Sequence, residues 1–315
     1  MNEKNKKIID CFKLLSKHYE CNGLKWKKRA IDKAIKILNK YNDVIISGAH
    51  AKQLDNIGEG IAKRIDEIIQ TNTLVELKTI ETKESLALHD FCRITGVGPS
   101  KANKWINDDK LYSIDDLKNA IANDKIKVTH HIEIGLKYLN DFEQKIPRPK
   151  IELFEILLKK TIKSFKDKNI MFEICGSYRR GLKSSGDVDI LLSHQHDKNY
   201  LKKLVTRLTN IGCIIDNLTS LGDKKYMGVY MIDKIARRID IRFIERKSYY
   251  TAMLYFTGSK DFNIKMRNIA LKKGYSLSEY HLRNVETSED IFLNSEKELF
   301  DILKKKYVKP TERIP

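Results

Sequence analysis

The spacing of apolar residues predicts helices in the first half of the chain and a mixture of helices and strands in the second. Apolar residues recur at intervals of three and four through about residue 146, as at Ile8, Phe12 and Leu15, which is typical of amphipathic helices. Further along, apolar runs of strand length predict strands at 172–175, 188–192, 228–232 and 238–244, and helices at 153–165, 201–208 and 295–307. The pattern predicts an α+β fold.

The run Pro147-Arg148-Pro149 is the clearest linker signal in the chain, because prolines interrupt a helical pattern. We expect four parts: helical segments at 1–80 and 81–147, an α+β domain at 148–246 and a smaller unit of helices and short strands at 247–315. A chain of 315 residues is long enough to form several separate cores.

Basic residues outnumber acidic ones by 60 to 42, which gives a net charge of +18. An excess of this size favours a polyanionic partner, with nucleic acid ahead of an anionic membrane. The excess is uneven: 16 basic against 10 acidic residues (+6) at 1–80, 10 against 11 (−1) at 81–147, and 34 against 21 (+13) at 148–315. The second segment therefore needs some means other than bulk charge to hold DNA.

No apolar run approaches the length of a membrane span, and no signal-peptide pattern follows Met1. The cysteines are scattered, nowhere form Cys-x-x-Cys, and indicate neither a zinc site nor a disulfide framework; they are Cys11, Cys21, Cys92, Cys175 and Cys213. We expect a soluble monomer without membrane contact in a reducing intracellular compartment. The pattern leaves nuclear, cytoplasmic and viral settings open.

Two glycine pairs share the pattern Gly-x-Gly-x-x-Lys, 38 positions apart, at Gly58-x-Gly60-x-x-Lys63 and Gly96-x-Gly98-x-x-Lys101. Helix-like segments flank both pairs, so each is predicted to form the turn of a helix-hairpin-helix unit. The backbone amides of such a turn can face a DNA phosphate and hold DNA without reading its sequence. An ordinary helix–helix turn is the alternative. A dinucleotide-binding loop is excluded, because neither pair follows a strand or has a third glycine.

Three aspartates predict a metal site. Asp187 and Asp189 are two apart in a strand-like run, so both carboxylates can point to one side of the strand. Asp240 has the same kind of position in a second run, and adjacent strands would bring the three acids together. Three close carboxylates repel one another unless cations neutralise them. Two Mg²⁺ ions would suffice, with Mn²⁺ able to substitute; a solvated strand face is the alternative.

The segment 176–181, Gly-Ser-Tyr-Arg-Arg-Gly, follows a strand-like run and concentrates backbone amides, the Ser177 hydroxyl and two guanidiniums. Glycine allows close approach to the backbone, and Arg binds phosphate oxygens in a two-pronged way. Beside a metal pair, such a segment would hold a triphosphate. The predicted reaction is in-line nucleotidyl transfer, in which one metal activates the attacking hydroxyl and the other holds the leaving pyrophosphate.

With these motifs the sequence resembles the family X DNA polymerases, and most nearly their β-type members. The likeness covers almost the whole chain, and its further motifs occur in the family's order: 47–49, 95–100, 130–131, 134–138, 255–259 and 295–297. The resemblance implies an N-terminal lyase-like domain of the 8-kDa type at 1–80, a second DNA-binding subdomain at 81–147, a catalytic palm at 148–246 and a nascent-base-pair-binding subdomain at 247–315. It also implies a monovalent cation, Na⁺ or K⁺, at each hairpin.

The resemblance further implies a role for each matching residue. Ser177, Arg180 and Gly186 would hold the triphosphate; Asp187 and Asp189 would bind both metals, and Asp240 would complete the metal at the primer 3′-hydroxyl beside Arg238. The sugar and the nascent pair would meet Tyr255, Phe256, Gly258, Asn263 and Arg267, while Arg242 and Glu279 would form a switch pair. DNA would meet Lys27, Lys52, Gly58, Gly60, Lys63, Arg64, Gly96, Gly98, Ser100, Lys101 and Arg267.

One departure from the family concerns its lyase activity. In β-type members a lysine after the first hairpin forms a Schiff base with the 5′-deoxyribose phosphate, but Arg64 has that place here, and Gly60 replaces a supporting lysine. A guanidinium stays protonated and cannot attack an aldehyde. Lys63 is the adjacent residue, on the N-terminal side, and points about 100° away on a helix. We therefore expect weak or absent lyase activity.

The function expected on this basis is template-directed synthesis across short gaps in base-excision-type repair, without proofreading. The implied partners are gapped or nicked double-stranded DNA, deoxynucleoside triphosphates, and repair proteins such as a ligase. Three alternatives remain open: a template-independent terminal transferase, a nucleotidyltransferase acting on RNA or a small molecule, and an inactive DNA-binding scaffold. The effect of Lys260, at a position where the family often has an acid, does not follow from the sequence.

Overall fold

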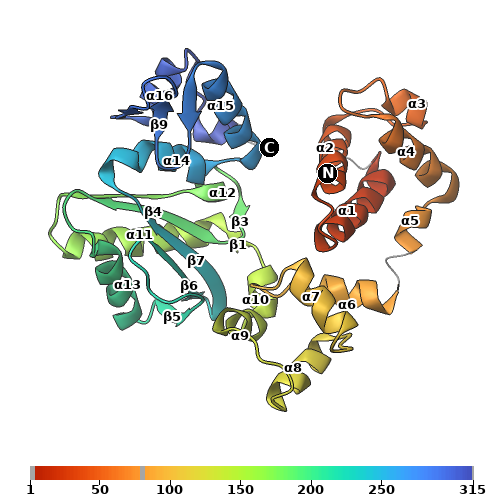
Figure 1. Ribbon diagram of the computed structural model, residues 1–315, viewed down its shortest axis with the longest axis horizontal. Coiled ribbons are helices and arrows are strands. Elements are labelled where there is room, and N and C mark those ends of the chain that lie inside the picture. Colours follow the sequence, from red (N-terminus) through yellow and green to blue (C-terminus); the bar gives the residue numbers. More distant parts are fainter. Residues whose placement is uncertain (1–3, 79–81, 314–315) are drawn as a thin grey trace. The chain divides into compact units, whose positions relative to one another are not determined.

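The computed structural model describes residues 4–78 and 82–313 and divides into two compact units, one extending to Leu136 and the other beginning at Lys137 (Figure 1). The predicted α+β class is confirmed, since helices fill the first unit and a sheet with helices forms the second. The boundary expected between residues 80 and 81 lies outside the described residues. No helix of the described part is long and apolar enough to cross a bilayer.

The first unit is built from short amphipathic helices around an apolar core. Its core includes Ile9, Phe12 and Leu15 at the spacing of one helix face, packed against residues such as Leu38 and Ile65. The helices are α1 (Lys6–Cys21), α2 (Lys25–Lys40), α3 (Gly48–Ala51), α4 (Glu59–Thr71), α5 (Val75–Lys78), α6 (Lys83–Phe91), α7 (Pro99–Asn107), α8 (Ile114–Ala122) and α9 (His130–Lys137).

The second unit is organised by a five-stranded sheet in the order β2-β4-β7-β6-β5. Strands β4 and β7 pair in parallel, and the other neighbours are antiparallel. The strands of this sheet are β2 (Ile170–Ile174), β4 (Val188–His194), β5 (Ile214–Asn217), β6 (Lys225–Ile232) and β7 (Ile235–Phe243). Of these, β5 was not expected from the sequence.

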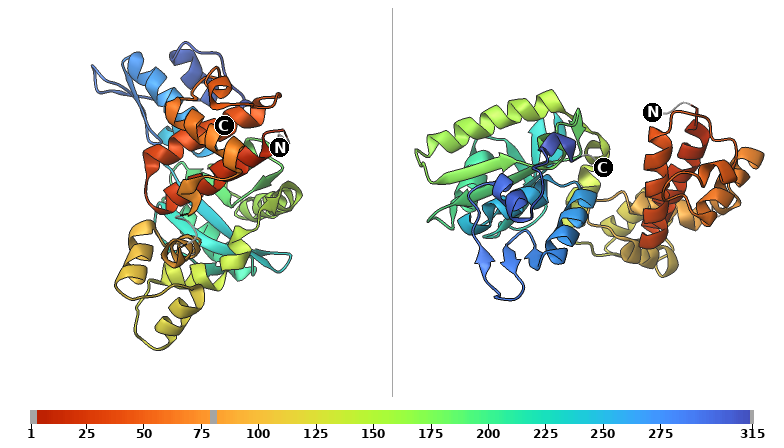
Figure 2. Two further views of the ribbon diagram at one scale, coloured as in Figure 1. Left: turned by 90° about the vertical axis from the view of Figure 1, so that its right-hand side faces the viewer. Right: turned by 90° about the horizontal axis from the view of Figure 1, so that it is seen from above.

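Helices cover both faces of this sheet. On one face, α11 (Arg148–Ser164) and α13 (Tyr200–Asn210) pack on Val188, Ile190 and Leu192 of β4. On the other, α14 (Tyr249–Thr257) packs on Leu191. Figure 2 (right) shows the long helix α11 above the sheet and the segment that follows β7 below it. Because side chains alternate along a strand, Asp189 lies on the same face as Leu191.

The remaining elements complete the second unit. They are α10 (Leu139–Glu143), β1 (Ile146–Pro147), α12 (Gly176–Arg179), β3 (Ser184–Ser185), η2 (Arg246–Ser248), α15 (Lys260–Lys272), β8 (Tyr275–Leu277), β9 (Leu282–Asn284), β10 (Asp290–Ile291), α16 (Glu296–Ile302) and η3 (Pro310–Glu312). The run expected as a linker is part of this unit, since Pro147 pairs with Ser184 and α11 begins at Arg148. The last predicted helix is shorter than expected; Lys304, with a φ of +48°, lies beyond its end.

Candidate active site

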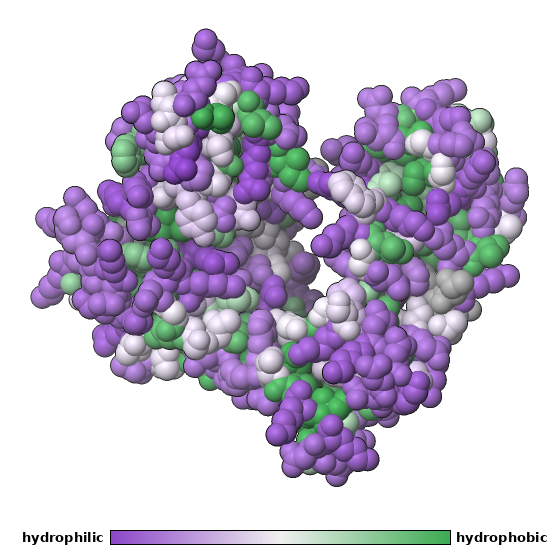
Figure 3. Space-filling model, in the orientation of Figure 1, coloured by the Kyte–Doolittle hydropathy of each residue, from purple (hydrophilic) through white to green (hydrophobic). Residues whose placement is uncertain are grey.

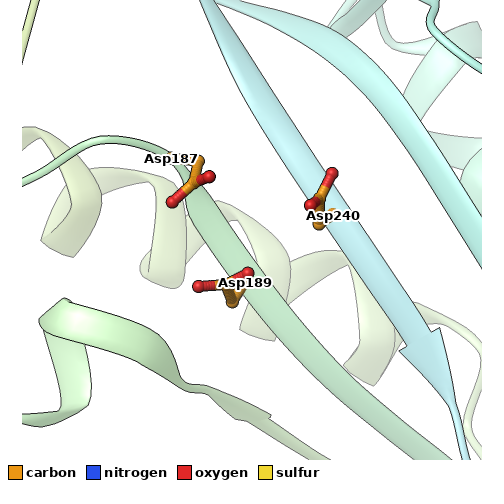
Figure 4. Close-up of side chains that lie close together, drawn as sticks. All are labelled: Asp187, Asp189 and Asp240. Atoms are coloured by element: carbon orange, nitrogen blue, oxygen red, sulfur yellow. The ribbon is translucent and has the colours of Figure 1, made fainter. Parts of the chain in front are cut away.

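The three predicted acids meet on one face of the parallel strand pair (Figure 4). Asp189 of β4 is the register partner of Asp240 of β7, and Asp187 immediately precedes β4. Each carboxylate offers one oxygen that lies within 4.8 Å of the corresponding atoms of the other two. Among residues 4–78 and 82–313, this is the only group of three or more potential ligands gathered so closely.

The segment expected to hold the triphosphate begins directly against these acids. Gly176 has a φ of +57°, and a Cβ on it would lie 2.3 Å from Oδ2 of Asp189. Only glycine can therefore start the α12 turn at this distance from the carboxylate. The backbone is fixed there too, because the Cys175 N–H donates to the Asp189 carbonyl at 2.8 Å.

Burial and repulsion from neighbouring carboxylates make Asp189 and Asp240 costly to ionise. Burial, with the nearby charges of Asp187 and Asp240, raises the pKa of Asp189 to about 7. The pKa of Asp240 is raised by burial first and by Asp187 second, and its buried Oδ1 accepts no hydrogen bond from the described residues. Arg238 forms an ion pair with Asp187. Clustered carboxylates and an unsatisfied buried oxygen are the donor set that hard divalent cations bind, so the site suits two metals.

The raised pKa of Asp189 predicts that Mg²⁺ stabilises the protein more at about pH 8 than at about pH 5. An acid whose folded pKa is about 7 and whose ordinary value is 3.8 lowers stability as the pH rises between these values, and the loss persists above them. Bound cations would offset it where the carboxylates are ionised. The measurement is the change in melting temperature on adding Mg²⁺ at each pH.

Asp189→Asn provides the control for this experiment, because it removes the titrating charge. We expect it to reduce both the pH dependence and the Mg²⁺ effect. Equal Mg²⁺ stabilisation of the unaltered chain at both pH values would contradict the prediction.

The other residues expected at the triphosphate lie in and after α12. Ser177 is half-buried. Arg180 donates from Nη1 to the Thr257 carbonyl at 2.6 Å, which connects the segment to the end of α14. A Cβ on Gly186 would lie 3.6 Å from Nζ of Lys145, so a further cation is close to this glycine. Burial lowers the pKa of Arg180, while the charge of Asp189 opposes that effect.

The residues expected at the sugar and nascent pair lie at the junction of α14 and α15. Asn263 donates to the Tyr255 carbonyl at 2.7 Å, and the guanidinium of Arg267 lies 5.1 Å from the centre of the Tyr255 ring. The Phe256 ring meets Tyr255 edge to face, and Gly258 follows with a φ of +67°. A small pocket in this region is lined by Thr251, Leu254, Tyr255, Asn263, Arg267, Leu277 and Ser278.

The pair expected to act as a switch is not joined in this structure. Glu279 instead lies 3.6 Å from Arg267 in an ion pair, and the Arg242 guanidinium lies 5.8 Å from the Phe256 ring centre. Arg242 does share a strand face with Arg238 and Asp240, because the three alternate along β7.

Both predicted hairpins are present in the first unit, but their alignment differs from the expected one. Asn56 and Gly96 have φ of +64° and +93°, Ile57 and Val97 donate to the carbonyls of Leu54 and Ile94, and Gly58 and Gly98 cap α4 and α7. The repeat is therefore 40 positions rather than 38. Gly60 is a helical residue that corresponds to Ser100, and Lys63 and Lys101 do not correspond to each other.

The two hairpins present exposed helix starts. Gly58 and Gly98 are exposed, and neither α4 nor α7 has a side-chain hydrogen bond at its cap. The first amides of a helix have no intrahelical acceptor, so these are available to an anion. Around them Gly60, Lys63, Gly96 and Ser100 are also exposed, and Lys101 is half-buried.

Arg64 occupies a closed network at the place expected for a lyase lysine. It donates from Nε and Nη2 to Glu76 at 3.1 and 2.8 Å, from Nη2 to the Tyr19 hydroxyl at 3.1 Å and from Nη1 to the Gly60 carbonyl at 3.0 Å. The Tyr19 hydroxyl donates to Glu76 at 2.5 Å, and Lys27 lies over the Tyr19 ring. Lys52 pairs with exposed Glu59.

One candidate DNA contact was missed from the sequence. Trp26 is 80% exposed at the start of α2 and stacks with the Arg29 guanidinium at 5.5 Å. A tryptophan among four basic residues, Lys25-Trp26-Lys27-Lys28-Arg29, is the signal that could have found it. Exposed aromatic rings beside cations are suited to stacking on unpaired bases.

Comparison with known families agrees with this geometry along most of the chain. The family model described as DNA polymerase beta palm matches residues 145–246, and DNA polymerase beta thumb matches 252–314. The fingers domain of DNA polymerase lambda matches 89–143, and a helix-hairpin-helix domain matches 3–74. The chain belongs to the family X DNA polymerases. The palm match of this family X chain contains all three aspartates and the α12 segment.

Curated family X relatives match the chain over nearly its full length. It is 30% identical to DNA polymerase lambda of Arabidopsis thaliana over 98% of this chain and 62% of the relative, and 29% identical to DNA polymerase lambda of Rattus norvegicus over 98% and 56%. The DNA polymerase/3′-5′ exonuclease PolX of Bacillus subtilis (strain 168) is 25% identical over 94% and 52%. The chain thus spans little more than half the length of these relatives.

Proposed function

We propose that the chain is a template-directed DNA polymerase that fills short gaps, as in base-excision-type repair, by two-metal nucleotidyl transfer. The observation that carries the proposal is the meeting of Asp187, Asp189 and Asp240 beside the α12 turn. Relatives named DNA polymerase lambda support it. We propose Mg²⁺ as the metal, replaceable by Mn²⁺, and Na⁺ or K⁺ at the hairpins.

The protein's own groups would place the reactants. The amides and hydroxyl of the α12 turn and the Arg180 guanidinium would bind the triphosphate, for which Arg180 exchanges the Thr257 carbonyl for phosphate oxygens. Arg238 would release Asp187 and contact the primer end. Divalent cations bound at the triad would activate the attacking hydroxyl and hold the departing pyrophosphate. Tyr255, Phe256 and Gly258 would lie against the sugar.

The DNA-binding part of the proposal rests on the two hairpins. Each offers exposed helix-start amides to a phosphate, and a duplex flanks a gap on each side. The charge of +18 favours the same partner, and the visible face in Figure 3 is mostly hydrophilic. We propose that Trp26 stacks on a base exposed in the gap. A ligase is a proposed protein partner, because a filled gap leaves a nick to be sealed.

Primer extension on one-nucleotide-gapped DNA with Mg²⁺ tests the function. We expect addition of the complementary deoxynucleotide and little addition of the other three. Failure to add the complementary nucleotide would overturn the proposal. A single-stranded primer without template distinguishes this function from the main alternative, because a terminal transferase would extend that primer as readily as the gapped substrate.

The Arg64 network predicts weak Schiff-base trapping on an incised abasic site, and a gain on Arg64→Lys. At neutral pH the neutral fraction of a lysine exceeds that of an arginine by about a hundredfold or more, so the variant should give clearly more covalent adduct with borohydride. The matched control is Lys63→Arg, on the neighbouring exposed position. Strong trapping by the unaltered chain would contradict the prediction, and its loss in Lys63→Arg would identify the lysine involved.

A further inference from the structure

Two helices of the first unit carry the same motif, His-x-x-Cys, where they pack together. His18-Tyr19-Glu20-Cys21 ends α1, and His89-Asp90-Phe91-Cys92 ends α6 and includes its cap. The ring centres of His18 and His89 are 5.8 Å apart, and Ser85 Oγ lies 3.5 Å from His18 Nδ1. One turn further along, the thiols of Cys21 and Cys92 are hydrogen-bonded to each other.

We propose that Cys21 and Cys92 form a reversible disulfide bond that fastens α1 to α6. The hydrogen bond brings the two thiols together, and the histidine and serine contacts one turn earlier hold the helices together at that level. Cys21 is buried and Cys92 is partly exposed, so an oxidant can reach one member of the pair. The sequence does not indicate this pairing, because the two residues are 71 positions apart.

The same four side chains are not arranged as a ready metal site. Zinc ligands must converge within a few ångströms of one point, and no combination of three of these groups does so in the described ranges, where the aspartate triad alone is gathered closely enough. The hydrogen-bonded pair of thiols therefore favours a disulfide over zinc.

The reaction is a thiol–disulfide exchange with a small disulfide such as oxidised glutathione. One cysteine thiolate attacks the small disulfide, forms a mixed disulfide and displaces one small thiol. The second cysteine then attacks the protein sulfur of the mixed disulfide and displaces the other small thiol. The two cysteines are oxidised, the small disulfide is reduced, and the two protein thiol protons pass to the released thiols.

The surroundings favour the thiolate form of Cys21. The hydrogen bond from Cys92 lowers the pKa of Cys21, with a smaller contribution from Lys17, and the same hydrogen bond raises the pKa of Cys92. Attack requires a thiolate, so Cys21 is suited to the second attack, on the mixed disulfide that the accessible Cys92 forms.

The disulfide bond would join the two parts of the unit that we propose to bind DNA. Helix α1 packs in the bundle that holds α3 and α4, the first hairpin, and α6 enters the second hairpin. A covalent link between α1 and α6 would hold these parts together across the segment 79–81, and it would stabilise the unit by restricting the unfolded chain.

Incubation of the full chain with oxidised and reduced glutathione, in the absence of DNA and nucleotide, tests the proposal. We expect the oxidised form to lose two hydrogen atoms in intact mass, to yield a linked Cys21–Cys92 peptide pair, and to melt about 5 °C or more higher than the reduced form. Reducing agent should reverse all three changes.

Cys92→Ser, at the partly exposed position, should abolish the linked species and the rise in melting temperature. Cys11→Ser, which removes another thiol of α1, should retain both. The proposal fails if both thiols remain fully open to alkylation under the oxidant, if the linked pair forms without raising the melting temperature, or if the purified chain instead holds stoichiometric zinc that Cys92→Ser releases. None of these outcomes depends on polymerase activity.

Discussion

Asp240→Ala is expected to reduce nucleotide addition on one-nucleotide-gapped DNA by at least about 10³-fold. A metal ligand that stabilises charge at the reacting oxygens contributes several kcal/mol to the transition state, and each 1.36 kcal/mol is about a factor of ten in rate. Asp240 is the acid on β7 that faces Asp189 across the strand pair, and its buried Oδ1 has no hydrogen-bond donor among the described residues. Removing it leaves only the two acids at the start of β4.

Single-turnover extension measures this loss, and gapped-DNA affinity measured separately shows whether binding is spared. Asp240→Asn is the matched variant, because it keeps the shape and removes the charge; it should lose nearly as much activity. Asp233→Asn, on an exposed turn before β7, is the control and should retain activity. An Asp240→Ala chain within tenfold of the unaltered one would contradict the assignment of the triad.

The sequence identifies the candidate metal-binding acids more readily than it predicts that all three lie close together. Two-residue spacing places Asp187 and Asp189 on one side of a strand whatever the fold. The register of Asp189 with Asp240 depends on β4 and β7 being parallel neighbours, and no local pattern in either strand specifies that pairing. The family resemblance supplied it. The sequence predicts Gly176 as a place where phosphate approaches the backbone. It does not reveal that the Asp189 carboxylate also lies too close for a side chain at this position.

The hairpin alignment shows how a motif can mislead. Asn56 takes the left-handed conformation that Gly96 takes in the second copy, which asparagine tolerates better than other residues with a side chain. The first hairpin therefore lacks one motif glycine, and the helical Gly60 appeared to replace it. Contacts between distant segments, such as Arg64 with Tyr19, also could not be derived from spacing, because they depend on how helices pack.

Glu296→Ala is expected to destabilise the second unit by about 3–5 kcal/mol. Glu296 is 5% exposed and accepts from Arg313 Nη1 at 2.5 Å and from Arg179 Nη2 at 3.1 Å. The Arg313 side chain is fully buried, stacked near Phe300. Removing the carboxylate would leave a buried guanidinium without its counter-charge. This lowers the free energy of unfolding more than replacing both partners with apolar residues would. Because Arg179 belongs to the α12 turn, the segment that we propose to bind the triphosphate should loosen as well.

The measurement is thermal and urea unfolding, with an expected fall in melting temperature of about 10 °C. Lys297→Ala, exposed on the same helix, is the matched control and should change stability by less than about 0.5 kcal/mol.

Burial acts to raise the pKa of Glu296, but the bonds from Arg313 and Arg179 lower it overall. The stabilisation by ionised Glu296 is therefore present above the ordinary pKa of 4.5 and is lost as the pH falls through the lower folded pKa. The difference between Glu296→Gln and the unaltered chain should shrink in acid; a difference independent of pH would mean that packing, rather than charge pairing, determines the loss.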